Sequence, residues 1–133
     1  MDFRAIPAKA ATNLTGRSAE DAACRYLVAQ GLTLLERNFR CRCGEIDLVM
    51  RERGVTVMVE VRYRLRPAPI HPAVTITFTK RRRILDAAAL WLRARPGFSQ
   101  DPLRFDVMAV SGMLDKPRCE WLRAAFDASD SRR

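Results

Sequence analysis

The sequence is poor in histidine and in long apolar runs, and each shortage excludes a class of protein. No apolar segment approaches the roughly 18 residues that a membrane-spanning helix needs. The N-terminal residues lack the charged and then apolar pattern of a secretory signal. We therefore expect a cytoplasmic protein without a membrane partner. The single histidine, His71, lies among prolines with no visible partner, so its expected place is a solvated loop and not a catalytic centre.

Zinc-ligand spacing is also lacking among the cysteines. Cys41 and Cys43 form a Cys-x-Cys pair, whereas structural zinc sites use Cys-x-x-Cys or added histidines. Without a secretion signal, these two residues and Cys24 and Cys119 are expected to be reduced thiols. A redox or metal role for Cys41 and Cys43 is the minority alternative.

Lysine is scarce, although the chain is strongly basic. Lysine and arginine total 24 against 15 aspartates and glutamates, which gives a net charge of +9 and an isoelectric point of about 10.4. Only Lys9, Lys80 and Lys116 are lysines, so arginine supplies most of the charge. The guanidinium group pairs well with phosphate. The composition thus favours nucleic acid or another anionic surface as the partner.

The length of 133 residues predicts a single domain, residues 1–133, with a core that needs neither disulfide nor structural metal. Residues 1–15 show no period and predict a flexible basic arm. Three prolines in residues 63–75 exclude a helix or central strand and predict a mobile loop. Residues 128–133 are expected to form a frayed tail.

Hydrophobic periodicity predicts two helices and four or five strands. Ser18 and Asp21 predict a capping box at the start of the first helix, and Gly31 predicts its end. The predicted helices span residues 18–30 and 79–95, and the strands span residues 32–39, 45–51, 55–62 and 103–110, with a short last strand at 120–122. This order predicts an α/β fold with a mixed central sheet flanked by helices.

Three acidic residues interrupt segments that otherwise predict a buried core. Glu20 falls within the apolar arc of the first helix, Asp47 lies between Ile46 and Leu48, and Glu60 interrupts a run of valines. Buried carboxylates are costly unless they are paired or bind a metal. Magnesium and manganese prefer oxygen ligands and are usually held by one or two carboxylates together with substrate phosphate. The three acids therefore predict a Mg or Mn site.

Cationic residues lie close to these acids in the predicted fold. Arg62 follows Glu60 by two residues, on the same strand face and near the expected place of a scissile phosphate. Lys80 and Arg81 fall in the first turn of the second helix, where they could face the same cleft. A run of arginines such as that at positions 81–83 is most often a solvated helix face, but the anionic partner expected from the composition favours a phosphate-contacting surface here.

At these residues the chain resembles the YraN-type family of bacterial endonuclease-like proteins. That family is similar to Holliday-junction resolvases and other PD-(D/E)xK nucleases. The segments that carry the resemblance are residues 16–20, 37–38, 44–48 and 59–62, Lys80 with Ile84 and Leu85, residues 104–106, and residues 125–126.

The resemblance implies a restriction-endonuclease-like αβββαβ core. It also implies that Glu20 is the helix acid, Asp47 the main metal ligand and Glu60 the second ligand. Arg62 stands where the family motif has lysine. Arginine cannot act as a base, although it can stabilise the reacting phosphate, and Glu45 ranks below these four.

Four further residues are predicted to contact nucleic acid: Lys80, Arg81, Arg64 and Arg104. For Lys80 and Arg104 the alternative is a structural role. Lys80 could also supply, from the neighbouring helix, the amine that is missing because position 62 is arginine. The catalytic set is thus predicted to be Glu20, Asp47, Glu60 and Arg62.

Three functions are consistent with these residues. The first is a metal-dependent endonuclease that cleaves DNA, including branched or structured DNA, by attack of metal-activated water on phosphorus. The second is a non-catalytic nucleic-acid-binding module that retains the nuclease fold, and the third is a basic protein-interaction domain. DNA is the expected partner with RNA as an alternative, and related resolvases suggest a homodimer.

Overall fold

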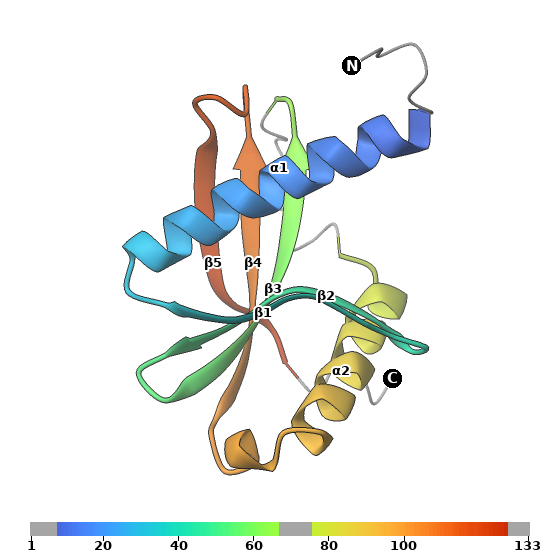
Figure 1. The fold of residues 1–133 in the computed structure, drawn as a ribbon, viewed down its shortest axis with the longest axis vertical. Coiled ribbons are helices and arrows are strands. Elements are labelled where there is room, and N and C mark those ends of the chain that lie inside the picture. Colours follow the sequence, from blue (N-terminus) through green and yellow to red (C-terminus); the bar gives the residue numbers. More distant parts are fainter. Residues whose placement is uncertain (1–7, 67–75, 128–133) are drawn as a thin grey trace.

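Two helices cover opposite faces of a five-stranded sheet (Figure 1). The computed structural model describes residues 8–66 and 76–127, and side chains of its first helix from residue 16 onward. The elements are α1 (Ala8–Ala29), β1 (Thr33–Cys41), β2 (Gly44–Glu52), β3 (Val55–Arg64), α2 (Phe78–Arg93), a 3-10 turn η3 (Pro96–Phe98), β4 (Leu103–Ser111) and β5 (Arg118–Phe126). The predicted α/β class, with a restriction-endonuclease-like core, is confirmed.

The sheet is mixed, as the sequence predicted. Its strands lie in the order β1-β2-β3-β4-β5, and every neighbouring pair is antiparallel except β3 and β4. Parallel neighbours need a long crossover, and α2 lies in the connection between these two strands. As the third of the five strands, β3 occupies the centre of the sheet, and one helix packs on each of its two faces.

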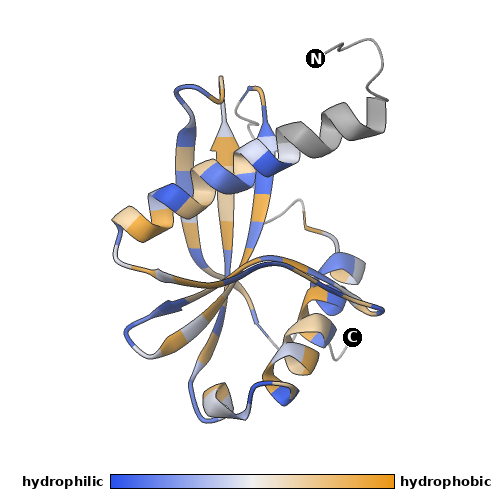
Figure 2. Ribbon diagram, in the orientation of Figure 1, coloured by the Kyte–Doolittle hydropathy of each residue, from blue (hydrophilic) through white to orange (hydrophobic). Residues whose placement is uncertain are grey.

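Alternation along β3 divides its side chains between two cores. Val57 and Val59 are buried in the core that contains Leu27 of α1, whereas Met58 is buried in the core that contains Trp91 of α2. The period of two predicted this division. Along α2, hydrophobic and hydrophilic colours alternate (Figure 2), as expected of a helix with one buried face. Within the described ranges, no helix is long and apolar enough to cross a membrane.

The first helix begins earlier than predicted. α1 starts at Ala8 and not at Ser18, so the predicted capping box at Ser18 is wrong, since this residue lies inside the helix. Residues 8–15 include three alanines, which have the highest helix propensity. The predicted flexible arm, 1–15, is therefore helical from residue 8, and residues 1–7 lie outside the described residues.

Strand boundaries differ from the prediction at two places. β3 continues through Tyr63 and Arg64, which the prediction placed in the 63–75 loop, and the Tyr63 hydroxyl donates to the Gly112 carbonyl at 2.8 Å. β5 is also longer than the predicted 120–122. Residues 67–75 of the predicted mobile loop and the predicted frayed tail, 128–133, lie outside the described residues.

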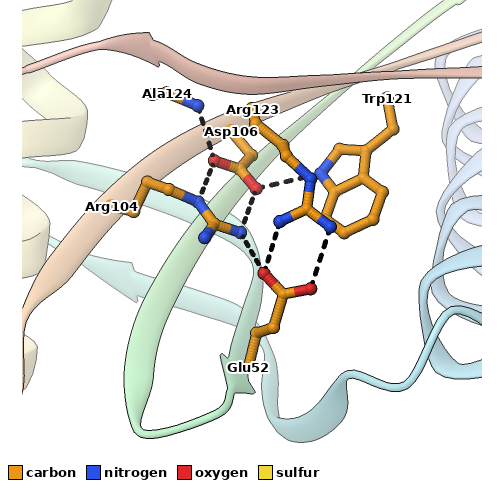
Figure 3. A network of polar contacts seen from close by, with 6 residues as sticks. All are labelled: Glu52, Arg104, Asp106, Trp121, Arg123 and Ala124. Atoms are coloured by element: carbon orange, nitrogen blue, oxygen red, sulfur yellow. Dashed lines mark hydrogen bonds and ion pairs between the residues drawn. The ribbon is translucent and has the colours of Figure 1, made fainter.

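A polar network joins the ends of β2, β4 and β5 (Figure 3). Asp106 is fully buried, and its carboxylate accepts hydrogen bonds from both Arg104 Nε and Nη2, from Trp121 Nε1 and from the Ala124 amide. Arg104 Nη2 also donates to Glu52 Oε1 at 2.9 Å. These bonds satisfy a buried carboxylate that would otherwise be destabilising. The network therefore has a structural role.

Candidate active site

Asp47 lies where β2 and β3 stop pairing. The last paired residues are Leu48 and Val59, and beyond them the Val61 amide donates to Asp47 Oδ2 at 2.8 Å. Alternation along β2 is also interrupted here, since Ile46 is buried in the core under α2 and Leu48 in the core under α1. The Asp47 carboxylate thus takes the place of a backbone acceptor between two diverging strands.

Glu60 projects from β3 toward the first turn of α2. Its side chain is only 4% exposed, and its Oε1 lies 2.7 Å from Lys80 Nζ. Lys80 is held at this position by the helix start, since its amide donates to the Oγ1 of Thr77, the N-cap residue. The ion pair joins the central strand to α2 and offsets the cost of burying the Glu60 carboxylate.

Glu20 approaches from α1, on the other side of the sheet end. Arg37 Nη2 lies 3.8 Å from Glu20 Oε1 but only 2.7 Å from Asp21 Oδ1, so Asp21 is the closer partner of this arginine. The buried Oε1 of Glu20 has no hydrogen-bond partner. A carboxylate oxygen that is buried and lacks a donor has the free lone pairs that a cation needs.

A cavity of about 410 Å³ brings these elements together. We call it the acidic cavity, and it is lined by Gly16, Ala19, Glu20, Asp47, Glu60, Val61, Arg62, Tyr63, Arg64 and Lys80. The lining therefore includes Glu20, Asp47, Glu60 and Arg62, the four residues predicted to be catalytic, and two of those predicted to contact nucleic acid, Arg64 and Lys80.

The electrostatics of the acidic cavity favour the protonated forms of Asp47 and Glu20. Burial, followed by repulsion from Glu60, raises the pKa of Asp47 to about 7, although the Val61 amide and Lys80 act in the opposite direction. Burial and then the charge of Asp47 raise the pKa of Glu20, while hydrogen bonding by Asn38 opposes the shift. A divalent cation would relieve the repulsion that raises these values.

The residues of the acidic cavity fit a hard cation only in part. Within residues 8–66 and 76–127, no three histidine, cysteine or acidic side chains are arranged to hold a metal ion. Magnesium commonly needs only one or two protein carboxylates, with water and substrate phosphate as the other ligands. Asp47 and Glu60 meet that requirement, and the free oxygen of Glu20 offers a further acceptor. The donor chemistry thus suits Mg²⁺ or Mn²⁺.

Three predicted residues lie elsewhere. Arg104 does not line the acidic cavity, and Asp106 and Glu52 bind its guanidinium group, which favours the structural alternative, while its contact with nucleic acid stays a prediction. Arg81 donates to the Ile76 carbonyl, and its guanidinium lies 5.7 Å from the centre of the Phe126 ring, outside the acidic cavity. Glu45, ranked below the others, pairs with Arg40 at 3.4 Å on the hairpin.

Two contributors to the acidic cavity were not singled out from the sequence. Asn38 hydrogen-bonds Glu20 and has a positive φ of 53°, a conformation that asparagine tolerates better than most residues. Tyr63 lines the cavity because β3 is longer than predicted. Asn38 could have been found from the family resemblance, because residues 37–38 carry part of it. Tyr63 could have been found by continuing the period-two alternation of β3 beyond Val61.

The Cys41 and Cys43 side chains are close neighbours on the hairpin between β1 and β2. Both are free thiols, and their Sγ atoms lie 2.8 Å apart in a hydrogen bond. They have no place in the acidic cavity. All four cysteines are free, as predicted.

Comparison with known proteins gives a consistent result over most of the chain. The family model described as "Uncharacterised protein family UPF0102" matches residues 19–110. A UPF0102 protein of Alkalilimnicola ehrlichii is 46% identical over 114 residues, which cover 86% of this chain and 87% of the relative. A UPF0102 protein of Pseudomonas putida is 42% identical over 123 residues, which cover 92% and 99%. The matched residues include the three acids of the acidic cavity.

Proposed function

The chain belongs to the UPF0102 family, and for this member we propose a metal-dependent DNA endonuclease that acts in the acidic cavity. The observation that carries the proposal is the meeting of Glu20, Asp47 and Glu60, from three different elements, in one cavity that also holds cationic side chains. Carboxylates repel phosphate. They serve a phosphate-binding cavity when a divalent cation lies between the two groups.

The residues of the acidic cavity divide into two groups. Asp47 and Glu60 are the residues that would hold Mg²⁺ or Mn²⁺, with the free Glu20 oxygen close by. A bound ion of this kind supplies a Lewis acid and a water molecule of lowered pKa. Arg62 and Lys80 lie in the same lining and would bind oxygens of the phosphodiester, orient it and stabilise its developing charge.

In this proposal Lys80 of α2 supplies the amine that is missing at position 62 of β3, where the chain has arginine. The guanidinium of Arg62 stays protonated and cannot accept a proton from water. The Lys80 ammonium lies within hydrogen-bond distance of Glu60 and lines the acidic cavity. Of the two cations, only lysine is chemically able to exchange a proton, so we assign that role to Lys80 and electrostatic stabilisation of phosphate to Arg62.

A non-catalytic nucleic-acid-binding module is the second candidate. One specific observation favours it: Arg62 stands where the motif of related nucleases has lysine. In that case the basic residues of the acidic cavity would still contact phosphate, but no cleavage would occur.

Cleavage of DNA separates the two candidates. Wild-type protein is incubated with linear, supercoiled and four-way-junction DNA in Mg²⁺, in Mn²⁺ and in EDTA. Asp47→Asn and Glu60→Gln test the carboxylates with little change of shape. Asp115→Asn is the matched control, because Asp115 is an exposed acid that does not line the acidic cavity.

The expected result is metal-dependent cleavage by wild type and by Asp115→Asn, with loss of at least about a hundredfold in rate in the other two variants. Cleavage that persists in Asp47→Asn and Glu60→Gln would contradict the assignment of these residues. DNA binding without cleavage by wild type, in either metal and on all three substrates, would favour the binding module.

A further inference from the structure

A second cavity lies beside the acidic cavity and shares one residue with it. This cavity has a volume of about 500 Å³. We call it the cationic cavity, and it is lined by Arg40, Cys41, Gly44, Glu45, Thr77, Thr79, Lys80, Arg83 and Ile84. Its lining comes from the β1–β2 hairpin and from the start of α2. Lys80 lines both cavities and therefore stands between them.

Positive charge in the cationic cavity is poorly neutralised by the protein. Arg83 makes no ion pair or side-chain hydrogen bond within the part of the chain that the structure describes. Arg40 pairs with Glu45 at 3.4 Å, but these side chains are 74% and 54% exposed, and exposed pairs contribute little. Lys80 is neutralised by Glu60 of the acidic cavity, so the unbalanced positive charge of the cationic cavity comes from Arg83, with Arg40 only weakly paired.

The start of α2 adds to this positive field. The helix has no acidic residue in its first turn, where acids usually complement the positive end of the helix dipole. Instead Lys80 lies in this turn and Arg83 follows in the next one, so both positive charges are near the positive end of the dipole. The repulsion among these groups would be relieved by an anion in the cationic cavity.

The wall of the cationic cavity is fixed by close packing. A Cβ atom at Gly44 would lie only 2.6 Å from the Arg83 carbonyl oxygen, so the hairpin backbone lies directly against α2. Ile84, the next residue, is buried in the core below. The backbone of Arg83 is therefore packed against the hairpin, which gives the cationic cavity a preformed wall.

We propose that the cationic cavity binds a backbone phosphate of DNA next to the phosphate held in the acidic cavity. This inference rests on the proposed function, since it takes DNA as the substrate. Arg83 and Arg40 bind the phosphate oxygens, and the hydroxyls of Thr77 and Thr79 line the same space. A strand that crosses Lys80 would place successive phosphates in the two cavities. The cationic cavity thus sets where the strand lies relative to the three acids.

Binding of a labelled DNA duplex, measured by fluorescence anisotropy over a range of salt concentrations in EDTA, tests the proposal. The variant is Arg83→Gln. Arg82→Gln is the matched control, because Arg82 is the preceding exposed arginine of the same helix and lines neither cavity. Thermal unfolding of each variant checks that the fold is retained.

Arg83→Gln is expected to weaken DNA binding about tenfold and to lower the slope of log K against log salt by about 0.9, because one phosphate contact is lost. Arg82→Gln is expected to change the slope by less than half of that. Equal effects of the two variants would overturn the proposal that the cationic cavity binds a phosphate. The proposed function would still stand in that case if wild type cleaves DNA. Absence of DNA binding by wild type in EDTA would overturn the cationic cavity as a phosphate site, and absence of both binding and cleavage in Mg²⁺ and Mn²⁺ would overturn the proposed function as well. Tighter binding of duplex RNA would overturn the choice of DNA.

Discussion

The Lys80 ammonium lies 2.7 Å from Glu60 Oε1, and this pair joins the first turn of α2 to the central strand of the sheet. Glu60 is nearly buried, whereas Lys80 is 40% exposed and lines both cavities. The start of α2 thus places a lysine in the cavity that Arg62 of β3 also lines. A primary amine and a permanently charged guanidinium therefore line the same cavity.

Substitution of Lys80 by arginine separates its charge from its ability to lose a proton. We expect Lys80→Arg to lower kcat by about 10² to 10⁴, the usual contribution of general acid–base catalysis, with DNA affinity changed less than about threefold. Single-turnover cleavage and anisotropy measure the two quantities. A further change, Arg62→Lys, is expected to restore part of the rate in the Lys80→Arg background. An unchanged kcat in Lys80→Arg would contradict proton exchange by Lys80.

Removal of the Asp47 charge is expected to stabilise the protein while abolishing cleavage. The pKa of Asp47 is raised from 3.8 to about 7 in the folded protein, so the folded protein holds a proton that the unfolded chain releases. Stability is therefore lost as pH rises between these values, and the loss is complete above the folded pKa. The amide oxygen that Asp47→Asn introduces can still accept from the Val61 amide.

The measurement is urea unfolding of wild type and Asp47→Asn between about pH 4 and pH 8 without divalent cations. The free energy of unfolding of Asp47→Asn relative to wild type should grow from near zero at the acid end to about 1–3 kcal/mol at the alkaline end. A difference that does not depend on pH would show that Asp47 titrates normally. Such stabilisation on loss of function is typical of active-site charges.

Arg104 is expected to support stability and to leave DNA binding alone. Arg104→Ala leaves the fully buried Asp106 carboxylate without its ion-pair partner, which should lower the free energy of unfolding by about 3–5 kcal/mol. Arg123→Ala is the control, since Arg123 is 50% exposed and also pairs with Glu52, and it should cost less than about 1 kcal/mol. The salt slope of DNA binding should be unchanged in Arg104→Ala, measured well below its unfolding temperature; a lower slope would return Arg104 to the nucleic-acid surface.

The four cysteines should differ in their rates of alkylation. The hydrogen bond from the Cys43 thiol lowers the pKa of Cys41, whereas the same bond raises the pKa of Cys43, and burial raises the pKa of Cys24 and of Cys119. All four are partly exposed, but burial also limits access to Cys24 and Cys119, so the comparison of Cys41 with Cys43 is the one that isolates the hydrogen bond. Because the thiolate is the reactive form, limited iodoacetamide treatment followed by peptide mapping should label Cys41 first. Cys43→Ala should slow that labelling; no change would exclude Cys43 as the cause.

The sequence carried enough information for the sheet and for the three acids of the cavity. Period-two alternation gave the two faces of β3, and the placement of Asp47 and Glu60 within apolar runs marked them as unusual. Both signals are local, since each depends on a few consecutive residues. The break of pairing at Asp47 was not predictable in this way, because it depends on how β2 and β3 diverge.

Other features depend on distant partners and could not be predicted. Arg104 binds Glu52, 52 residues away in the chain, so its charge alone did not reveal this structural partner. The cationic cavity depends on the contact between Gly44 and α2, which joins segments far apart in the chain. The early start of α1 was missed because residues 8–15 have helix propensity but no clear period.

Manganese binding, followed by electron paramagnetic resonance with and without a phosphorothioate DNA duplex, tests most directly whether the acids form a cation site. Wild type and Asp115→Asn should bind one Mn²⁺ in the presence of the duplex, and Asp47→Asn and Glu60→Gln should bind it at least about tenfold more weakly. Equal Mn²⁺ affinity in all four proteins, or no Mn²⁺ binding by wild type with the duplex present, would contradict the account.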